Sequence, residues 1–253
     1  MQAVRNLIER QRAAEAKDAC LLAERIGLSL DPWQQEAVRE SHAQMILNCS
    51  RQSGKSTVTS VIALHTAIYQ PGSLTLLLSP SLRQSQELFR KVKDGYQAID
   101  SGVPAEEESA LRMEFANDSR IVCLPGKEAT IRGFSGVDLL IVDEASRVED
   151  ALYYAIRPML AVSGGRIILL STPFGKRGFF HKEWTEGEGW QRIQVTAWEC
   201  PRISKDWLEE ERRAIGSWWF EQEYECQFKE TLDSVFSHAD IQRALDSSVT
   251  PLF

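Results

Sequence analysis

Residues 44–57 read Gln-Met-Ile-Leu-Asn-Cys-Ser-Arg-Gln-Ser-Gly-Lys-Ser-Thr, and this stretch decides the fold. An apolar run at 45–47 leads into a short polar loop, and a helix-like segment follows from Val58 to Tyr69. A loop of this size between a strand and a helix is the context in which Gly-Lys-Ser marks a nucleotide site. The usual eight-residue pattern opens with glycine, whereas Cys49 stands at that place here. A plain loop before a helix explains these residues less well, because both the context and the residue types fit.

The loop is suited to the phosphates of ATP and to Mg²⁺. Backbone N–H groups of the loop and of the first helical turn converge, and the helix dipole favours an anion there. Lys55 is expected to reach the β and γ phosphates, and the Ser56 hydroxyl to bind Mg²⁺. The other predicted nucleotide-binding positions of the loop are Ser50, Arg51, Gln52, Ser53, Gly54 and Thr57.

A second motif, Val-Asp-Leu-Leu-Ile-Val-Asp-Glu at 137–144, is an apolar run that ends in two carboxylates. Such a run is typical of a strand covered on both faces in a parallel sheet, whose carboxyl end faces the ligand. Asp143 is expected to reach the Mg²⁺ held by Ser56, and Glu144 to orient or deprotonate a water molecule. A solvated acidic turn would explain an isolated Asp-Glu pair. The phosphate loop earlier in the chain favours the catalytic interpretation, and adjacent carboxylates favour hydrolysis over kinase chemistry.

Length and composition are those of an ordinary globular protein. The chain has 253 residues, 43 % hydrophobic and 26 % charged, enough for one large α/β domain or two small ones. No apolar stretch approaches the roughly 20 residues of a membrane span. The polar, mixed-charge residues 1–12 do not read as a signal peptide. Five cysteines without a Cys-x-x-Cys pair argue against a zinc site or a disulfide framework and suggest a reducing compartment.

The charge is unevenly distributed along the chain. The net charge is −7, and residues 183–253 hold 15 acidic and 7 basic residues, a net of −8, so the first 182 residues are close to neutral. Nucleic-acid-binding surfaces normally carry excess lysine and arginine. A DNA contact is therefore expected as a local patch in the first 182 residues, or on another domain or subunit.

The pattern along the chain predicts three units: accessory helices at 1–30, an ATPase core at 31–198 and a helical lid or linker subdomain at 199–253. Asp31 and Pro32 read as the cap and first residue of a new helix. Ser101 to Ser109 reads as a polar loop. The alternation in the core predicts a mostly parallel central sheet flanked by helices. The expected strands are 45–49, 74–79, 111–115, 120–124, 137–144, 166–171 and 191–195. The strands 111–115 and 120–124 are expected to form a β-hairpin. The expected helices are 55–68, 83–98 and 149–160.

Two further polar residues each allow two interpretations. Thr172 follows the strand 166–171, where a polar residue of a motor ATPase would contact the γ-phosphate or water; a simple strand-ending turn before Pro173 is the alternative. Gln34 could read adenine N6 and N7 with its amide. It could equally complete a capping box with Asp31, and the two roles are compatible.

Three arginines are candidates for stabilising transition-state charge. Arg132 precedes the carboxylate strand and could be delivered to a neighbouring subunit, although a solvated loop arginine is the common case. Arg51 in the phosphate loop could act within its own subunit, and Arg177 is a third candidate. The aromatic run 218–220, Trp-Trp-Phe, is better explained as core of a small subdomain than as a stacking platform.

Together these motifs resemble the ATPase domain of the large terminase subunit of tailed bacteriophages, over about residues 30–230. The matching stretches are Trp33-Gln34, the deviant loop Cys49 to Thr57, Ile141 to Ala145, Ser171 to Pro173 and Phe220 to Tyr224. The resemblance implies a P-loop NTPase fold of the additional-strand, conserved-glutamate (ASCE, RecA-like) type. It also implies ATP and Mg²⁺, double-stranded DNA as the translocated substrate, a homo-oligomeric ring on a portal protein with a small terminase subunit, and Arg132 as a finger acting in trans.

Full terminases of this kind continue into a nuclease domain, whereas this sequence stops at Phe253, so no DNA cleavage is expected from it. The isolated chain is expected to be a monomer, and the expected location is the cytoplasm of the infected bacterial host. A helicase-like ATPase would need a second RecA-like domain. A non-catalytic P-loop assembly protein would not need Glu144.

Overall fold

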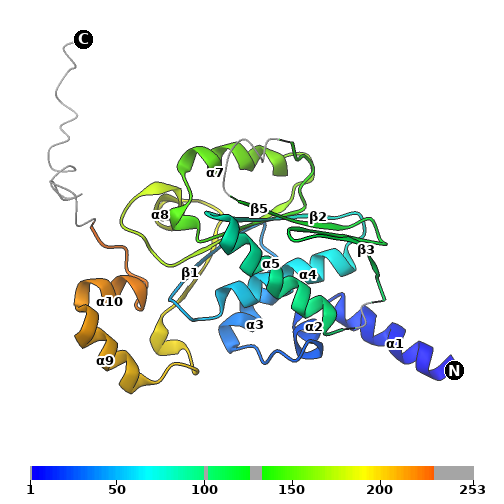
Figure 1. The fold of residues 1–253 in the computed structure, drawn as a ribbon, viewed down its shortest axis with the longest axis horizontal. Helices are drawn as coiled ribbons and strands as arrows, with labels where there is room; N and C mark the ends of the chain where they lie inside the picture. Colours follow the sequence, from blue (N-terminus) through cyan, green and yellow to red (C-terminus); the bar gives the residue numbers. More distant parts are fainter. Residues whose placement is uncertain (1, 100–101, 126–132, 231–253) are drawn as a thin grey trace, which may run out of the picture.

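The computed structural model describes residues 2–99, 102–125 and 133–230. Helices and strands alternate along most of this length (Figure 1). The helices and 3₁₀ turns are α1 (Gln2–Glu15), α2 (Ala19–Arg25), α3 (Pro32–Arg39), α4 (Lys55–Tyr69), α5 (Leu82–Gln97), η1 (Ala145–Arg147), α7 (Asp150–Ile156), η2 (Arg157–Leu160), α8 (Gly178–Thr185), η3 (Ala197–Glu199), α9 (Lys205–Ile215) and α10 (Ser217–Glu223). The strands are β1 (Gln44–Cys49), β2 (Leu74–Ser79), β3 (Ala105–Glu108), β4 (Arg112–Phe115), β5 (Arg120–Pro125), β6 (Leu139–Asp143), β7 (Arg166–Ser171) and β8 (Gln191–Val195).

The strands form one sheet in the order β3-β4-β5-β2-β6-β7-β1-β8. In this sheet order, every neighbouring pair from β5 onward, through β2, β6, β7 and β1 to β8, is parallel. The pairs β3-β4 and β4-β5 are antiparallel. The central strands β2 and β6 are buried along their whole length, as expected for strands covered on both faces. The predicted mostly parallel α/β sheet is confirmed, and so is the antiparallel pairing of the 111–115 and 120–124 runs.

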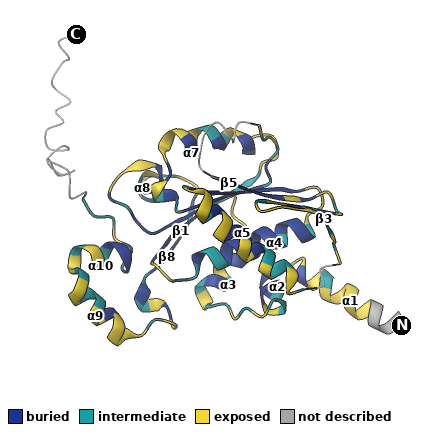
Figure 2. Ribbon diagram, viewed as in Figure 1, coloured by how far each residue is buried: buried dark blue, intermediate teal, exposed yellow. Residues whose placement is uncertain are grey.

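Two layers of helices cover the sheet (Figures 1 and 2). Residues of α2, α3, α4 and α5 pack with one face of the sheet in a single hydrophobic cluster. Residues of α7 and α8 pack on the opposite face, where the Tyr153 ring stacks on Phe179 at 4.0 Å between centroids. The alternating hydrophobic faces of the strands thus serve two separate cores, one per layer.

Two predicted segments, the loop 101–109 and the helix 149–160, differ from the structure. The supposed polar loop 101–109 contains strand β3, which extends the antiparallel edge of the sheet beside β4. Its three glutamates escaped a strand prediction because this edge strand has little buried surface. The predicted helix 149–160 divides into α7 and the 3₁₀ turn η2 at Arg157, because Pro158 cannot donate the hydrogen bond that would continue an α-helix.

The segment after β8 forms a small helical unit with its own core. Leu208, Phe220 and Tyr224 are buried there with Ala197. The prediction of an aromatic core holds for Phe220 but is wrong for Trp219, which is 45 % exposed. The division into three domains stays a prediction. Within the described residues, no helix is both long and apolar enough to cross a membrane.

Candidate active site

The phosphate loop lies between β1 and α4, at the carboxyl edge of the sheet. Its backbone leaves the usual regions twice, with φ of 60° at Gln52 and 92° at Gly54. The start of the loop is fixed to β8, because Ser50 N donates to Val195 O at 2.9 Å. Ser53 Oγ donates back to Ser50 O at 2.9 Å. The loop is therefore held in a defined shape by bonds on its outer side.

Lys55 and Glu144 face each other across this edge. Lys55 Nζ lies 3.5 Å from Glu144 Oε1, and both side chains are largely shielded from solvent. Glu144 has φ 50° and ψ 42°, a left-handed conformation that non-glycine residues rarely adopt and that is often found at functional sites. Its other oxygen lies 3.4 Å from Ser171 Oγ. The predicted phosphate-binding lysine and catalytic carboxylate are therefore brought together.

Asp143 ends β6 beside them and is 7 % exposed. Burial, and next the negative charge of Glu144, raises its pKa to about 6, against the opposing effect of Lys55. Asp143 and Ser56 line one cavity of about 150 Å³ together with residues of α5. Mg²⁺ takes oxygen ligands and commonly uses only one or two from the protein, with phosphates and water supplying the rest. The hydroxyl and carboxylate in this cavity fit that ion, which would also lower the cost of ionising Asp143.

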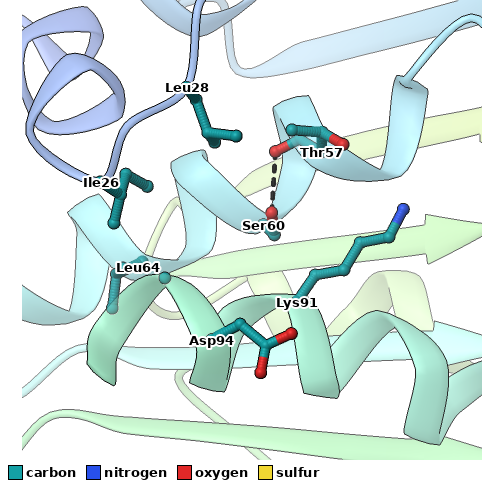
Figure 3. A pocket seen from close by; sticks show the side chains of 8 residues that line it. Ile26, Leu28, Thr57, Ser60, Leu64, Lys91 and Asp94 are labelled. Atoms are coloured by element: carbon teal, nitrogen blue, oxygen red, sulfur yellow. Dashed lines mark hydrogen bonds between the residues drawn. The ribbon is translucent and has the colours of Figure 1, made fainter. Parts of the chain in front are cut away.

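A second cavity of about 260 Å³ lies between α4, α5 and the segment after α2 (Figure 3). Thr57 and Ser60 line it from the first turns of α4, and Ile26 and Leu28 from the segment after α2. Lys91 extends from α5 and lines both this cavity and the one that holds Ser56 and Asp143. The two hollows thus share Lys91 of α5 in their linings.

Thr172 follows β7 and is 4 % exposed. Its carbonyl accepts a hydrogen bond of 2.8 Å from Ser146 Oγ, which also lies 2.7 Å from Ser171 Oγ. Ser146 sits in the turn just after Glu144. This pair of serines therefore connects the carboxylate strand β6 to the end of β7, and no sequence pattern had singled out Ser146.

Arg51 contacts the C-terminal helices. Its guanidinium pairs with Glu223 of α10, and its backbone N donates to Glu223 O at 3.2 Å. This contact with a carboxylate raises the pKa of Arg51. Arg177 lies over the ring of Phe174, 4.5 Å from its centroid. Arg132, the first candidate for the finger, lies outside the described residues.

Gln34 performs the predicted capping role, since its Oε1 accepts from Asp31 N at 2.8 Å. Its Nε2 is 3.5 Å from Ser53 O of the phosphate loop. Arg202, which follows η3, pairs with Asp31 at 2.7 Å and donates to the same Ser53 oxygen at 2.8 Å. Sequence reasoning missed Arg202 and Glu223, because each reaches the loop from a segment that is remote in sequence.

Comparison with known proteins places this geometry in a family. A family profile described as "Terminase large subunit, T4likevirus-type, N-terminal" matches residues 46–243. The terminase large subunit of Thermus virus P23-45 is 28 % identical over 244 residues, covering 82 % of this chain and 50 % of the relative. The chain thus spans about half the length of this relative.

Solved structures share the fold. The large terminase ATPase domain of Thermus phage P74-26 aligns with a TM-score of 0.73 and 22 % identity, covering 81 % of this chain and 96 % of that one. The large terminase of a thermophilic bacteriophage, in complex with ADP, aligns with a TM-score of 0.66 and 11 % identity, covering 79 % and 54 %. With a family profile matched over most of its length, this chain belongs to the terminase large subunit family and corresponds to its N-terminal part.

Proposed function

We propose that this chain binds ATP with Mg²⁺ and hydrolyses it to drive double-stranded viral DNA into a procapsid. The observation that carries the proposal is the meeting of Lys55, Glu144 and Asp143 at one edge of the sheet, beside the phosphate loop. The family, and the ADP complex of the thermophilic bacteriophage terminase, support nucleotide binding.

Each residue of this site has a separate role in the proposed reaction. Loop N–H groups and Lys55 hold the β and γ phosphates, and Ser56 with Asp143 would hold the Mg²⁺, which neutralises charge on the phosphates. Lys55 and Glu144 lie 3.5 Å apart, so a triphosphate that attracts Lys55 frees Glu144 to accept a proton from water. Thr172, which is bonded to the carboxylate strand through Ser146, would relay that change to β7 and the segment after it.

We propose the remaining parts of the function from the family. The working form is a homo-oligomeric ring on a portal protein, with a small terminase subunit as partner and the cytoplasm of the infected bacterium as its location. Arg132 would act in trans, so turnover by dilute protein should be slow and should rise more than linearly with protein concentration. Linear turnover that Arg132→Ala leaves unchanged would make Arg51 the better candidate.

Replacement of Glu144 by glutamine tests the proposal. Glu144→Gln keeps the shape and should retain ATP binding but lose turnover by about a hundredfold or more, roughly 2.7 kcal/mol of transition-state stabilisation. Glu149→Gln, an exposed carboxylate five residues further on, is the matched control and should keep full turnover. Unchanged hydrolysis in Glu144→Gln would favour a non-catalytic ATP-binding assembly protein. ATP turnover driven equally well by single-stranded nucleic acid would favour a helicase-like ATPase.

A further inference from the structure

Three distant parts of the chain meet at one backbone oxygen of the phosphate loop. Arg202 Nη2 donates to Ser53 O at 2.8 Å, and Gln34 Nε2 lies 3.5 Å from the same atom. Arg202 Nη1 is also 2.7 Å from Asp31 Oδ2. Asp31 N in turn donates to Gln34 Oε1 at 2.8 Å. The four residues close a ring of contacts around the Ser53 carbonyl, which we name the Ser53 clamp.

The clamp acts on the peptide that carries the next loop N–H. Ser53 C=O and Gly54 N–H belong to one planar trans peptide, in which the two groups point in opposite directions. Fixing the oxygen on the outer side therefore directs Gly54 N–H to the inner side, where loop amides surround phosphate. The fit is close: a Cβ at Gly54 would lie 2.6 Å from Gln34 Nε2 and 3.4 Å from Arg202 Nη2.

Arg202 is the stronger of the two donors to Ser53. Its bond is short and charge-assisted, whereas the Gln34 contact is at the limit of hydrogen-bond length. Asp31, whose carboxylate is 11 % exposed, fixes the direction of the guanidinium. Arg202 remains 49 % exposed, so its ion pair with Asp31 contributes little to the stability of the fold. The main effect of this geometry is to hold the bond from Arg202 to Ser53 O in a fixed direction.

The position of Arg202 connects the loop to the C-terminal helices. Arg202 lies between η3 and α9, and the carbonyl of Val195, at the end of β8, already accepts a bond from Ser50 N. Glu223 of α10 holds Arg51 in the middle of the loop. The beginning, middle and end of the phosphate loop are therefore each bonded to the part of the chain from β8 onward.

We propose that Arg202 is a positioning residue for phosphate binding, which orients the Gly54 N–H by holding the Ser53 carbonyl. The role rests on the proposed nucleotide site and adds a residue from the C-terminal helical unit to it. Arg202 touches the loop and not the base, so its loss must weaken every ligand that binds through a polyphosphate. Displacing the segment before α9 would weaken the same ligands, because binding and loop geometry are linked.

The test compares Mg·ATP with inorganic tripolyphosphate, measured by isothermal titration calorimetry on the whole chain. Arg202→Ala should weaken both ligands by the same factor, about tenfold, as expected for losing one charge-assisted bond. Arg202→Lys should recover part of the loss. Arg213→Ala is the control and should bind as wild type, because Arg213 is an exposed arginine of α9 whose guanidinium donates to Glu209 O of the same helix.

Two results would overturn the inference. Weakened ATP with unchanged tripolyphosphate would mean that Arg202 reads the base or ribose. Unchanged binding of both ligands to Arg202→Ala would mean that the bond from Arg202 to Ser53 O does not position the loop for phosphate. Thermal unfolding of each variant checks folding. If wild type bound neither ligand, the nucleotide proposal itself would fail.

Discussion

Asp143→Asn should make the protein more stable while it removes a metal ligand. Asp143 is the last residue of β6, at the carboxyl ends of the strands, beside the carboxylate of Glu144; it is 7 % exposed. Its pKa rises from the ordinary 3.8 to about 6, first because of burial and then because of Glu144. Asparagine has nearly the same shape, keeps an oxygen that can accept from Glu144 N and carries no charge to desolvate.

The size of the effect follows from the pKa. A carboxyl whose folded-state pKa lies above its unfolded value destabilises the folded state once pH exceeds the unfolded value, because the unfolded chain ionises first. One pKa unit corresponds to about 1.36 kcal/mol, so a rise from 3.8 to about 6 costs about 3 kcal/mol above pH 6. At pH 5 the native carboxyl is mostly protonated, and about half of that cost remains.

Urea unfolding of wild type and Asp143→Asn at pH 7.5 and pH 5, without metal or nucleotide, measures the difference. We expect Asp143→Asn to be about 1–3 kcal/mol more stable at pH 7.5, the lower end allowing for relaxation around the charge, and about half as much at pH 5. Asp94→Asn, an exposed carboxylate on α5, should change stability by no more than about 0.5 kcal/mol.

A destabilised Asp143→Asn variant at pH 7.5, or a gain in stability that did not shrink at pH 5, would contradict this prediction. Either result would mean that the ionised carboxylate is well compensated in the folded protein, for example by Lys55. A bound cation would then have no cost of ionising Asp143 to lower.

Three other perturbations test separate parts of the structure. Lowering the pH below about 6 should weaken Mg·ATP binding to wild type relative to Asp143→Asn, because the pKa of Asp143 is about 6 and the cation needs the ionised carboxylate. Calorimetry across pH 5–8 measures the ratio of the two affinities for Mg·ATP. A ratio that stayed constant with pH would contradict this prediction. Gly165→Ala should cost about 2–3 kcal/mol in urea unfolding, since its Cβ would lie 2.0 Å from Val137 O, whereas Gly164→Ala, with open space around it, should cost about 1 kcal/mol. Tyr69→Phe removes a hydrogen bond to the buried carboxylate of Glu15 and should cost about 1–3 kcal/mol, whereas Tyr154→Phe, 54 % exposed, should be neutral; equal effects of the two would exclude a buried network.

Local patterns predicted the sheet and the residues at its carboxyl edge. The runs 74–79, 137–144 and 166–171 are apolar enough to be predicted as strands buried on both faces, and the observed strands β2, β6 (Leu139–Asp143) and β7 are buried along nearly their whole length. Glu144 and Lys55 follow strands that prove to be separated by one neighbour in the sheet, so parallel topology brings them together. Strand β3 was missed because a charged edge strand has no hydrophobic period to detect.

The sequence by itself determined the strand–loop–helix unit, the carboxylates at the end of β6 and the parallel sheet, because each depends on residues adjacent along the chain. Only the tertiary structure decided what surrounds the loop. Glu223 reaches Arg51 across 172 residues, and Arg202 reaches Asp31 across 171. Polar side chains on a helix or loop carry no periodic signal that names a distant partner. Their contacts exist only once packing of the helical unit beyond β8 has placed them at the phosphate loop.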